Sequence, residues 1–117
     1  MLPNPNRLTR TADFERLFAA GKPLRHALCT LRAERNNLDV VRVGTVCGKR
    51  VGGAVVRNRA KRRLREAVRQ HLPSLPLGWD ILVVIQPAGA QASVGDFYCA
   101  LDELLRRREL TAAARGT

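Results

Sequence analysis

The segment from Ala54 to His71 constrains the fold more than any other part of this sequence. Gly52 and Gly53 precede it, Pro73 follows it, and its apolar residues recur at helical spacing. At about 100° per residue these side chains share one arc, which is typical of a helix that buries one edge. The residues of this arc are Ala60, Leu64, Ala67 and Val68. Such a helix needs a second layer against which it packs.

The second layer is predicted to be a small sheet. Residues 79–85 contain the uninterrupted run Ile81-Leu82-Val83-Val84-Ile85, which is typical of a strand buried on both faces. Residues 27–33 and 40–47 also resemble strands, and the turn-forming Arg35-Asn36-Asn37 lies between them. We therefore expect these two strands to pair as a hairpin.

Two further helices complete the predicted elements. Thr11 is expected to cap a helix that runs to about Ala20 and is followed by Gly21. Ser93 and Asp96 resemble a capping box, and the helix after them has an apolar face. That face consists of Phe97, Leu101, Leu104 and Leu105. The element order predicts an α/β (α+β) two-layer sandwich, one domain over residues 1–117, with 1–6 and 109–117 flexible.

The charge balance restricts the partner. The chain has 21 Lys and Arg against 10 Asp and Glu, a net charge of +11. Nine of the basic residues lie between Lys49 and Arg69, where Glu66 is the single acid. Such concentration predicts a polyanionic partner, either nucleic acid or an anionic membrane surface. No apolar run is long enough for a transmembrane helix and the first ten residues lack a signal core, so we expect a cytoplasmic protein.

The charged side chains of the central helix form a stripe beside its apolar arc. The stripe consists of Arg57, Asn58, Lys61, Arg62, Arg65 and Arg69. Guanidinium groups grip phosphate oxygens in pairs, so the stripe predicts salt-sensitive binding with little sequence readout. The alternative is a solvated face with intrahelical ion pairs. That alternative needs acids three or four residues away, and the helix offers only Glu66.

The aromatic residues allow two interpretations. Phe14 and Phe18 lie four residues apart on the first predicted helix, a spacing that favours core packing. The other interpretation is a stacking platform for single-stranded nucleic acid. Trp79 and Phe97 are expected to be core residues from their context.

No catalytic or metal-binding pattern is found. The segment Gly44–Arg50 resembles a phosphate loop but has three residues between its glycines and Arg50 in place of Ser or Thr. The three cysteines are widely spaced, with no Cys/His pairing that suggests a metal site. No Ser/His/Asp or HExxH set can be assembled, and the carboxylates are dispersed. We therefore expect no catalytic residue, metal ligand or bound cofactor in this chain.

Together these segments resemble the protein component of bacterial ribonuclease P. The resemblance rests on a long motif that is similar to the family's RNR signature, and it extends from Arg7 to Arg108. The motif comprises Val43-Gly44, Lys49-Arg50-Val51-Gly52 and residues 54–66, AVVRNRAKRRLRE. Supporting residues are Arg7-Leu8, Asp13-Phe14, Leu17-Phe18 and Gly78-Trp79-Asp80.

The resemblance implies a fold, a function and partners. The fold would be a small α/β sandwich with a left-handed βαβ crossover, against the usual right-handed rule. The chain would be the protein subunit of an endoribonuclease that removes the 5′ leader of precursor tRNA. Catalysis, with Mg²⁺, would belong to the RNA subunit. The protein would bind that RNA and the single-stranded leader, as one protein on one RNA.

The resemblance also implies site residues. Those facing the catalytic RNA would be Lys49, Arg50, Arg57, Asn58, Arg59, Lys61, Arg62 and Arg65. The leader cleft would hold Phe14, Phe18 and Leu31, which replaces the core interpretation of the two phenylalanines. This chain departs from many members of the family at Leu28, Leu31, Gly48 and Gln86, where aromatics, Ser and Arg are frequent.

Other functions remain open at this point. One is a non-catalytic RNA-binding or ribosome-associated protein of similar fold, and another is a DNA-binding architectural protein. A protein-only nuclease is disfavoured because no carboxylate cluster is found. Neither binding protein needs Phe14 and Phe18 in an open cleft, so the exposure of these rings discriminates between the readings.

Overall fold

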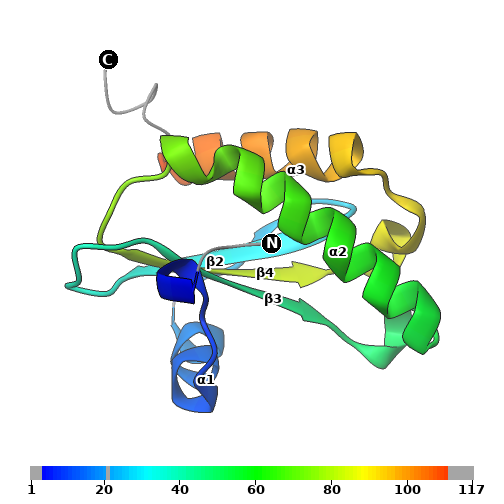
Figure 1. Ribbon diagram of the computed structural model, residues 1–117, viewed down its shortest axis with the longest axis horizontal. Coiled ribbons are helices and arrows are strands. Elements are labelled where there is room, and N and C mark those ends of the chain that lie inside the picture. The colour runs from blue at the N-terminus through cyan, green and yellow to red at the C-terminus, as the bar shows by residue number, and fades with distance from the viewer. Residues whose placement is uncertain (1–3, 21, 111–117) are drawn as a thin grey trace.

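The computed structural model describes residues 4–20 and 22–110, which form a four-stranded mixed sheet with helices on both faces (Figure 1). The strands are β1 (Leu24–Arg25), β2 (Cys29–Arg35), β3 (Arg42–Cys47) and β4 (Trp79–Ile85). The helices are α1 (Thr11–Ala19), α2 (Ala54–His71) and α3 (Val94–Arg107). The bounds of α2 and β4 are those predicted from the sequence. β1 is an additional short strand that no pattern indicated.

Strand β4 lies inside the sheet, whose order is β1-β2-β4-β3. Ile81, Val83 and Ile85 pack in the core beneath α2 and α3, whereas Leu82 and Val84 pack on the opposite face with α1. An inner strand covered on both faces has no polar side to present, which explains its continuous apolar run. The prediction of a buried strand is confirmed. The helices, however, occupy both faces of the sheet, since α1 lies opposite α2 and α3 (Figure 1).

The predicted hairpin is wrong. β2 and β3 do not pair, because β4 lies between them, antiparallel to β2 and parallel to β3. Residues 36–41 instead cross the beginning of β4, where the backbone N–H of Asn36 donates to the carbonyl of Gly78 at 2.9 Å. Asn37 takes a left-handed conformation with φ of 59°. The turn residues correctly predict that the chain reverses direction after β2. The predicted pairing fails because β4 is an inner strand, which pairs with β2 on one side and with β3 on the other.

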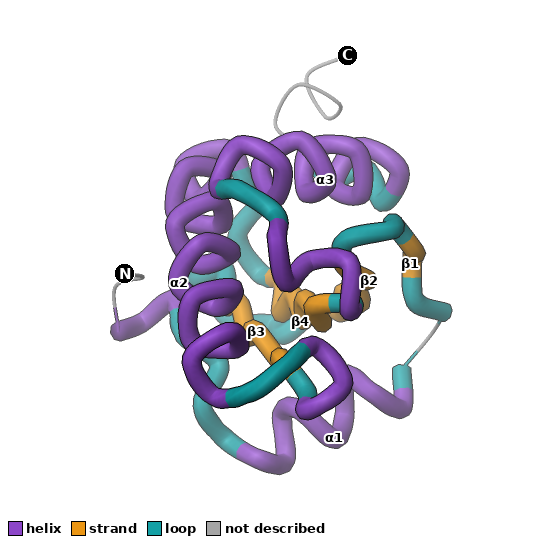
Figure 2. The backbone as a smooth tube through the Cα atoms, turned by 90° about the vertical axis from the view of Figure 1, so that its right-hand side faces the viewer, coloured by secondary structure: helices purple, strands orange, loops and turns teal. Residues whose placement is uncertain are grey.

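The β3–α2–β4 unit is a crossover between adjacent parallel strands. Figures 1 and 2 show both strands side by side, with α2 on one face of the sheet. Seen from the α2 side with the strands running upward, β4 lies to the left of β3. The crossover is therefore left-handed, as the family resemblance implies and against the usual rule.

The helix ends differ in how well the sequence predicted them. Ser93 and Asp96 form the predicted capping box at the start of α3. The predicted cap at Thr11 is wrong, because the N-cap of α1 is Arg10 and no side chain caps it. Gly21, the expected residue after the end of α1, lies outside the described residues.

Phe97 is buried, which confirms the prediction that it is a core residue. Trp79, also expected in the core, is only half-buried. Parts of the segments expected to be flexible are described. The side-chain amide of Asn6 donates to the carbonyl of Val41 at 2.7 Å, and Leu110 is buried. The flexibility of the ends and the single-domain organisation remain predictions. In the described part of the chain, no helix is both long and apolar enough to cross a membrane.

Candidate nucleic-acid interface

The cations of α2 line an open groove on the surface of the protein. The groove has a volume of about 510 Å³ and is lined by Val55, Asn58, Lys61, Arg62 and Arg65. Within residues 4–20 and 22–110, none of its three cations makes an ion pair. Val55 is 79% exposed. The groove therefore presents unneutralised charge together with an apolar contact point.

The single acid of α2 does not neutralise the groove. Glu66 accepts hydrogen bonds from Arg69, one of them at 2.9 Å, and from Gln70 at 3.2 Å. The hydrogen bonds from Arg69, and to a smaller extent that from Gln70, lower the pKa of Glu66 to about 2. Glu66 is therefore ionised at neutral pH and bonded to these two partners. The alternative of a solvated face with intrahelical pairs thus applies to Arg69 and not to Lys61 or Arg65.

The beginning of α2 adds positive charge. Lys49 and Arg50 are exposed on a 3₁₀ turn, Lys49–Val51, that directly precedes the helix. The N-cap of α2 is Gly53, with no side-chain cap and no acid in the first turn. Cations near a helix N-terminus are unfavourable for the helix itself, because its dipole is positive there. The arrangement costs helix stability and favours an anion that binds from outside.

Arg59 lies apart from the groove. At about 100° per residue it falls on the other flank of α2, next to Arg63, whose guanidinium donates to the carbonyl of Ala92 at 3.2 Å. Arg57 and Arg59 each have a buried Nε without a hydrogen-bond partner. The six predicted RNA-facing residues of α2 therefore do not share one patch, because they lie on two flanks of the helix.

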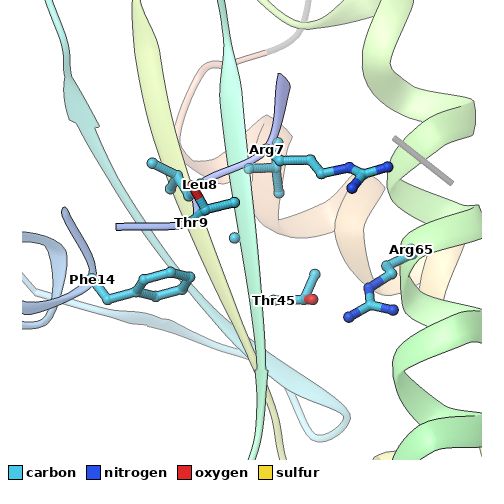
Figure 3. Close-up of a pocket in the computed structure, with 8 residues that line it drawn as sticks. Arg7, Leu8, Thr9, Phe14, Thr45 and Arg65 are labelled. Carbon is cyan, nitrogen blue, oxygen red and sulfur yellow. The ribbon is translucent and has the colours of Figure 1, made fainter. Parts of the chain in front are cut away.

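A second hollow, of about 400 Å³, lies at the outer edge of β3 between α1 and α2 (Figure 3). We call it the β3-edge pocket. Its lining residues are Arg7, Leu8, Thr9, Phe14, Val43, Gly44, Thr45 and Arg65. Figure 3 shows Phe14 on one side of the strand, with Thr45 and Arg65 on the other. Arg65 also lines the α2 groove, so the two hollows share a wall.

Gly44 allows the Phe14 ring to lie on the strand. A Cβ atom at position 44 would lie 2.7 Å from Cε1 of Phe14, closer than atoms can approach. A glycine inside a strand pattern is a sequence signal for such a close approach. Arg7 and Thr45 also line the pocket, and neither was among the predicted cleft residues. They meet because residues 7 and 8 run beside β3, where Leu8 N–H donates to the carbonyl of Val43 at 3.1 Å.

Replacing Gly44 with valine is expected to displace the Phe14 ring and fill the inner part of the pocket. Binding of single-stranded RNA at the pocket should fall to the level seen when Phe14 is replaced by alanine. Titration with a fluorescent oligonucleotide measures the effect, and Gly48→Val serves as the control, because no atom lies within 4 Å of a Cβ at position 48. Equal losses for both variants would contradict a specific role for Gly44.

The other two predicted cleft residues do not line the β3-edge pocket. Phe18 is 46% exposed, with the Arg32 guanidinium 5.7 Å from its ring centroid. Its open ring remains available for stacking outside the pocket. Leu31 is 1% exposed and packs in the core beneath α2 and α3. The placement of Leu31 in the cleft was wrong, because successive strand residues face opposite sides and Leu31 faces away from α1.

A buried carboxylate fixes the sheet face on which α1 and Phe14 lie. Asp80 is 0% exposed and accepts two hydrogen bonds from Arg42, at 2.8 and 2.7 Å, and further ones from Asn36 and Arg16. Arg16 comes from α1 and also pairs with Glu34 at 2.9 Å. Burial alone would raise the pKa of Asp80, but the hydrogen bonds from Arg42 and Asn36 and the charge of Arg42 outweigh it and lower the pKa. Asp13, Glu34 and Asp80 are far apart in the sequence but are linked through Arg16 and Arg42.

Asp80→Asn is expected to lower the free energy of unfolding by about 3 kcal/mol, because Arg42 and Arg16 lose the carboxylate they share. The folded-state pKa of Asp80 is below its unfolded-state value. Its stabilisation is therefore present above about pH 4 and is lost as the pH falls through the folded-state pKa. Urea unfolding at neutral and acidic pH measures both effects, and the difference from the unchanged protein should shrink in acid.

Asp102→Asn is the matched control, since among the described residues Asp102 pairs only with the exposed Arg106, at 3.0 Å. Exposed pairs of this kind contribute about 0–1 kcal/mol. Similar losses of unfolding free energy for the two variants would show that the contact between Asp80 and Arg16 does not hold α1 in place.

The donor chemistry of the described residues does not suit a metal ion. No group of three or more His, Cys, Asp or Glu side chains in this part of the chain is arranged to hold one. The carboxylates of Asp80, Asp13 and Glu34 lie close together, but each is paired with Arg16 or Arg42. Cys29, Cys47 and Cys99 are free thiols, and burial raises the pKa of Cys29 to about 12.

Comparison with known proteins gives one consistent result. The family profile described as Ribonuclease P matches residues 2–109. A ribonuclease P protein component of Chloroflexus aggregans is 43% identical over 103 residues, covering 87% of this chain and 76% of the relative. The RNase P protein from Thermotoga maritima superimposes with a TM-score of 0.76 at 30% identity, covering 86% of this chain and 96% of that one. The Staphylococcus aureus RNase P protein gives a TM-score of 0.80 at 25% identity, covering 91% and 97%.

Proposed function

The chain belongs to the ribonuclease P protein family, and from that membership we propose how its two hollows divide the work of RNA binding. The family supplies the protein subunit of ribonuclease P, the ribonucleoprotein endoribonuclease of tRNA 5′ processing, and its partner is the ribonuclease P RNA. We propose that the α2 groove binds this RNA and that the β3-edge pocket receives the 5′ leader of precursor tRNA.

The α2 groove suits a folded RNA. Lys61, Arg62 and Arg65 line this groove without an ion pair to any described residue, and the Lys49–Val51 turn extends the positive surface toward the start of the helix. Contacts of this kind bind phosphates without reading sequence. Asn58 lies among the cations with an amide that can both donate and accept, which suits a ribose hydroxyl.

The β3-edge pocket suits a single strand. An aromatic ring accepts any base by stacking, and nearby cations follow the backbone of the strand. Phe14 provides the ring, and Arg7 and Arg65 provide cations within the same lining. Phe18 and Arg32 form a further aromatic and cationic pair on α1 and β2, along which the strand can continue.

The observation that best supports this proposal is that Arg65 lines both hollows. Because one side chain lines both hollows, the leader would enter directly beside the docked catalytic RNA. Catalyst and substrate are both polyanions and repel each other. A protein of net charge +11 between them offsets that repulsion where the leader lies.

The remaining parts of the proposal concern the assembly. One protein would act with one RNA, in the cytoplasm. Mg²⁺ would be bound by the RNA, since the carboxylates that cluster on this protein are already paired with arginines. The protein would thereby contribute positioning and charge, while the RNA subunit performs the cleavage.

Binding of precursor tRNA with and without its 5′ leader tests the proposal. The protein should raise the affinity of the ribonuclease P RNA for leader-bearing substrate and change the affinity for leaderless tRNA little. Equal gains on the two substrates would show that the protein acts through the RNA or the tRNA body, and the β3-edge pocket would then have no role in leader binding.

A further inference from the structure

A second group of arginines lies at the end of the sheet where β4 begins. Two guanidinium groups share the indole of Trp79, with the Arg35 carbon 5.0 Å and the Arg108 carbon 5.3 Å from its ring centroid. Arg35 ends β2 and is the register partner of Trp79, and Arg108 directly follows α3. We call these three residues the Trp79 cluster. In Figure 1, this end of β4 lies far from the beginning of α2.

The cations of the Trp79 cluster are held in place without being neutralised. Within residues 4–20 and 22–110, neither Arg35 nor Arg108 makes an ion pair, although Glu109 follows Arg108 in the chain. Arg108 makes one long hydrogen bond, 3.4 Å, to the carbonyl of Ala33. Both arginines are exposed.

The neighbouring arginines of α3 behave differently. Arg106 pairs with Asp102 at 3.0 Å and Arg107 pairs with Glu103 at 3.7 Å, each one helical turn away. Of the three consecutive arginines 106–108, Arg106 and Arg107 are paired with acids, whereas Arg108 makes no ion pair within the described residues. This contrast separates the cluster from an ordinary solvated helix end.

The geometry of the cluster fits phosphate groups. An aromatic ring restricts the rotation of a guanidinium group that lies against it. The N–H groups of that guanidinium remain available to an anion. Two like charges on a single indole repel each other, and anions that bind at the two guanidinium groups relieve the repulsion. Successive phosphates of an RNA backbone provide such anions, and the family's partner is an RNA.

We propose that Arg35, Trp79 and Arg108 form a second contact with the backbone of ribonuclease P RNA, separate from the α2 groove. This inference rests on the family's partnership with that RNA and adds a surface that neither the α2 groove nor the β3-edge pocket includes. Contacts at two ends of the protein would fix its orientation on the RNA, so that the β3-edge pocket faces the incoming leader.

The test is the salt dependence of assembly between the protein and its ribonuclease P RNA, measured without substrate. Arg35→Gln with Arg108→Gln should reduce the slope of log K against log salt by about 1–2, since each phosphate contact contributes about 0.7–0.9. Assembly at moderate salt should weaken about 5- to 20-fold. The control, Arg106→Gln with Arg107→Gln, removes an equal number of positive charges beside the cluster and should leave the slope unchanged.

Several outcomes would overturn the proposal. Equal slopes for the two double variants would mean that only net charge matters or that the RNA does not reach this end. Arg35→Lys with Arg108→Lys retains both charges and should retain most of the slope. If this variant shows the same lowered salt slope as the glutamine variant while its thermal unfolding is unchanged, then loss of charge does not explain the lowered slope, and the proposed phosphate contact is contradicted. Lys61→Ala with Arg65→Ala belongs in the same assay, because a lowered slope there and none for the Trp79 cluster refutes this inference alone.

Discussion

Replacing Lys61 and Arg65 together with alanine should weaken assembly with ribonuclease P RNA by roughly 100-fold, about 3 kcal/mol. Both side chains line the α2 groove, and in the described part of the chain neither makes an ion pair. Their removal therefore takes away contacts with the RNA and little of the fold. The slope of log K against log salt should fall by about 1–2.

The matched control for this prediction removes two charges that already have partners. Arg69 pairs with Glu66 and Arg106 pairs with Asp102, so Arg69→Ala with Arg106→Ala changes the net charge equally. Filter binding or fluorescence anisotropy across a salt series compares the two variants. If both lower the affinity and the slope alike, the positive charge of the whole protein rather than the α2 groove drives assembly.

Phe14→Ala should reduce the affinity of the holoenzyme for leader-bearing precursor tRNA by roughly 5- to 150-fold, because stacking on an aromatic ring contributes about 1–3 kcal/mol per base. The affinity for leaderless tRNA should change little. Phe14→Leu is the sharper variant, since it keeps an apolar side chain beside Gly44 and removes the ring. It should lose most of the leader-dependent affinity while its urea unfolding stays close to that of the unchanged protein.

Phe18 provides an internal comparison. Its ring is outside the β3-edge pocket and largely open, so Phe18→Leu should have a smaller effect than Phe14→Leu on substrates with short leaders. If Phe14→Leu lowers the affinity for leaderless and leader-bearing tRNA equally, the Phe14 ring packs in the core beneath α1 and does not bind the leader. In that case the early interpretation of Phe14 as a packing residue would be the better one.

The fold was predictable where local signals were strong. The apolar arc of α2 lies between glycines and a proline, and β4 carries an uninterrupted apolar run, so both were placed with their observed bounds. Strand pairing was not predictable in the same way. An alternating strand pattern shows which residues face the core, but it does not show that β4, from much later in the chain, lies between β2 and β3.

The candidate site shows the same division. Helical periodicity alone predicted the stripe of Lys61, Arg62 and Arg65, because positions on one helix are related by a fixed rotation. Arg7 and Thr45 reach the β3-edge pocket only through tertiary contacts, so no local pattern identified them. Leu31 shows the converse error, in which a strand position was assigned to a cleft without knowledge of which face it occupies.

Cleavage of a 5′-extended precursor tRNA at low Mg²⁺ tests the central claim most directly. The reaction would contain the ribonuclease P RNA of the same organism, with and without this protein, and a third reaction would contain the protein alone. We predict that the protein restores accurate removal of the leader at Mg²⁺ concentrations where the RNA alone is nearly inactive, and that the protein alone cleaves nothing. A folded protein that binds the RNA but leaves its cleavage at low Mg²⁺ unchanged would contradict the claim.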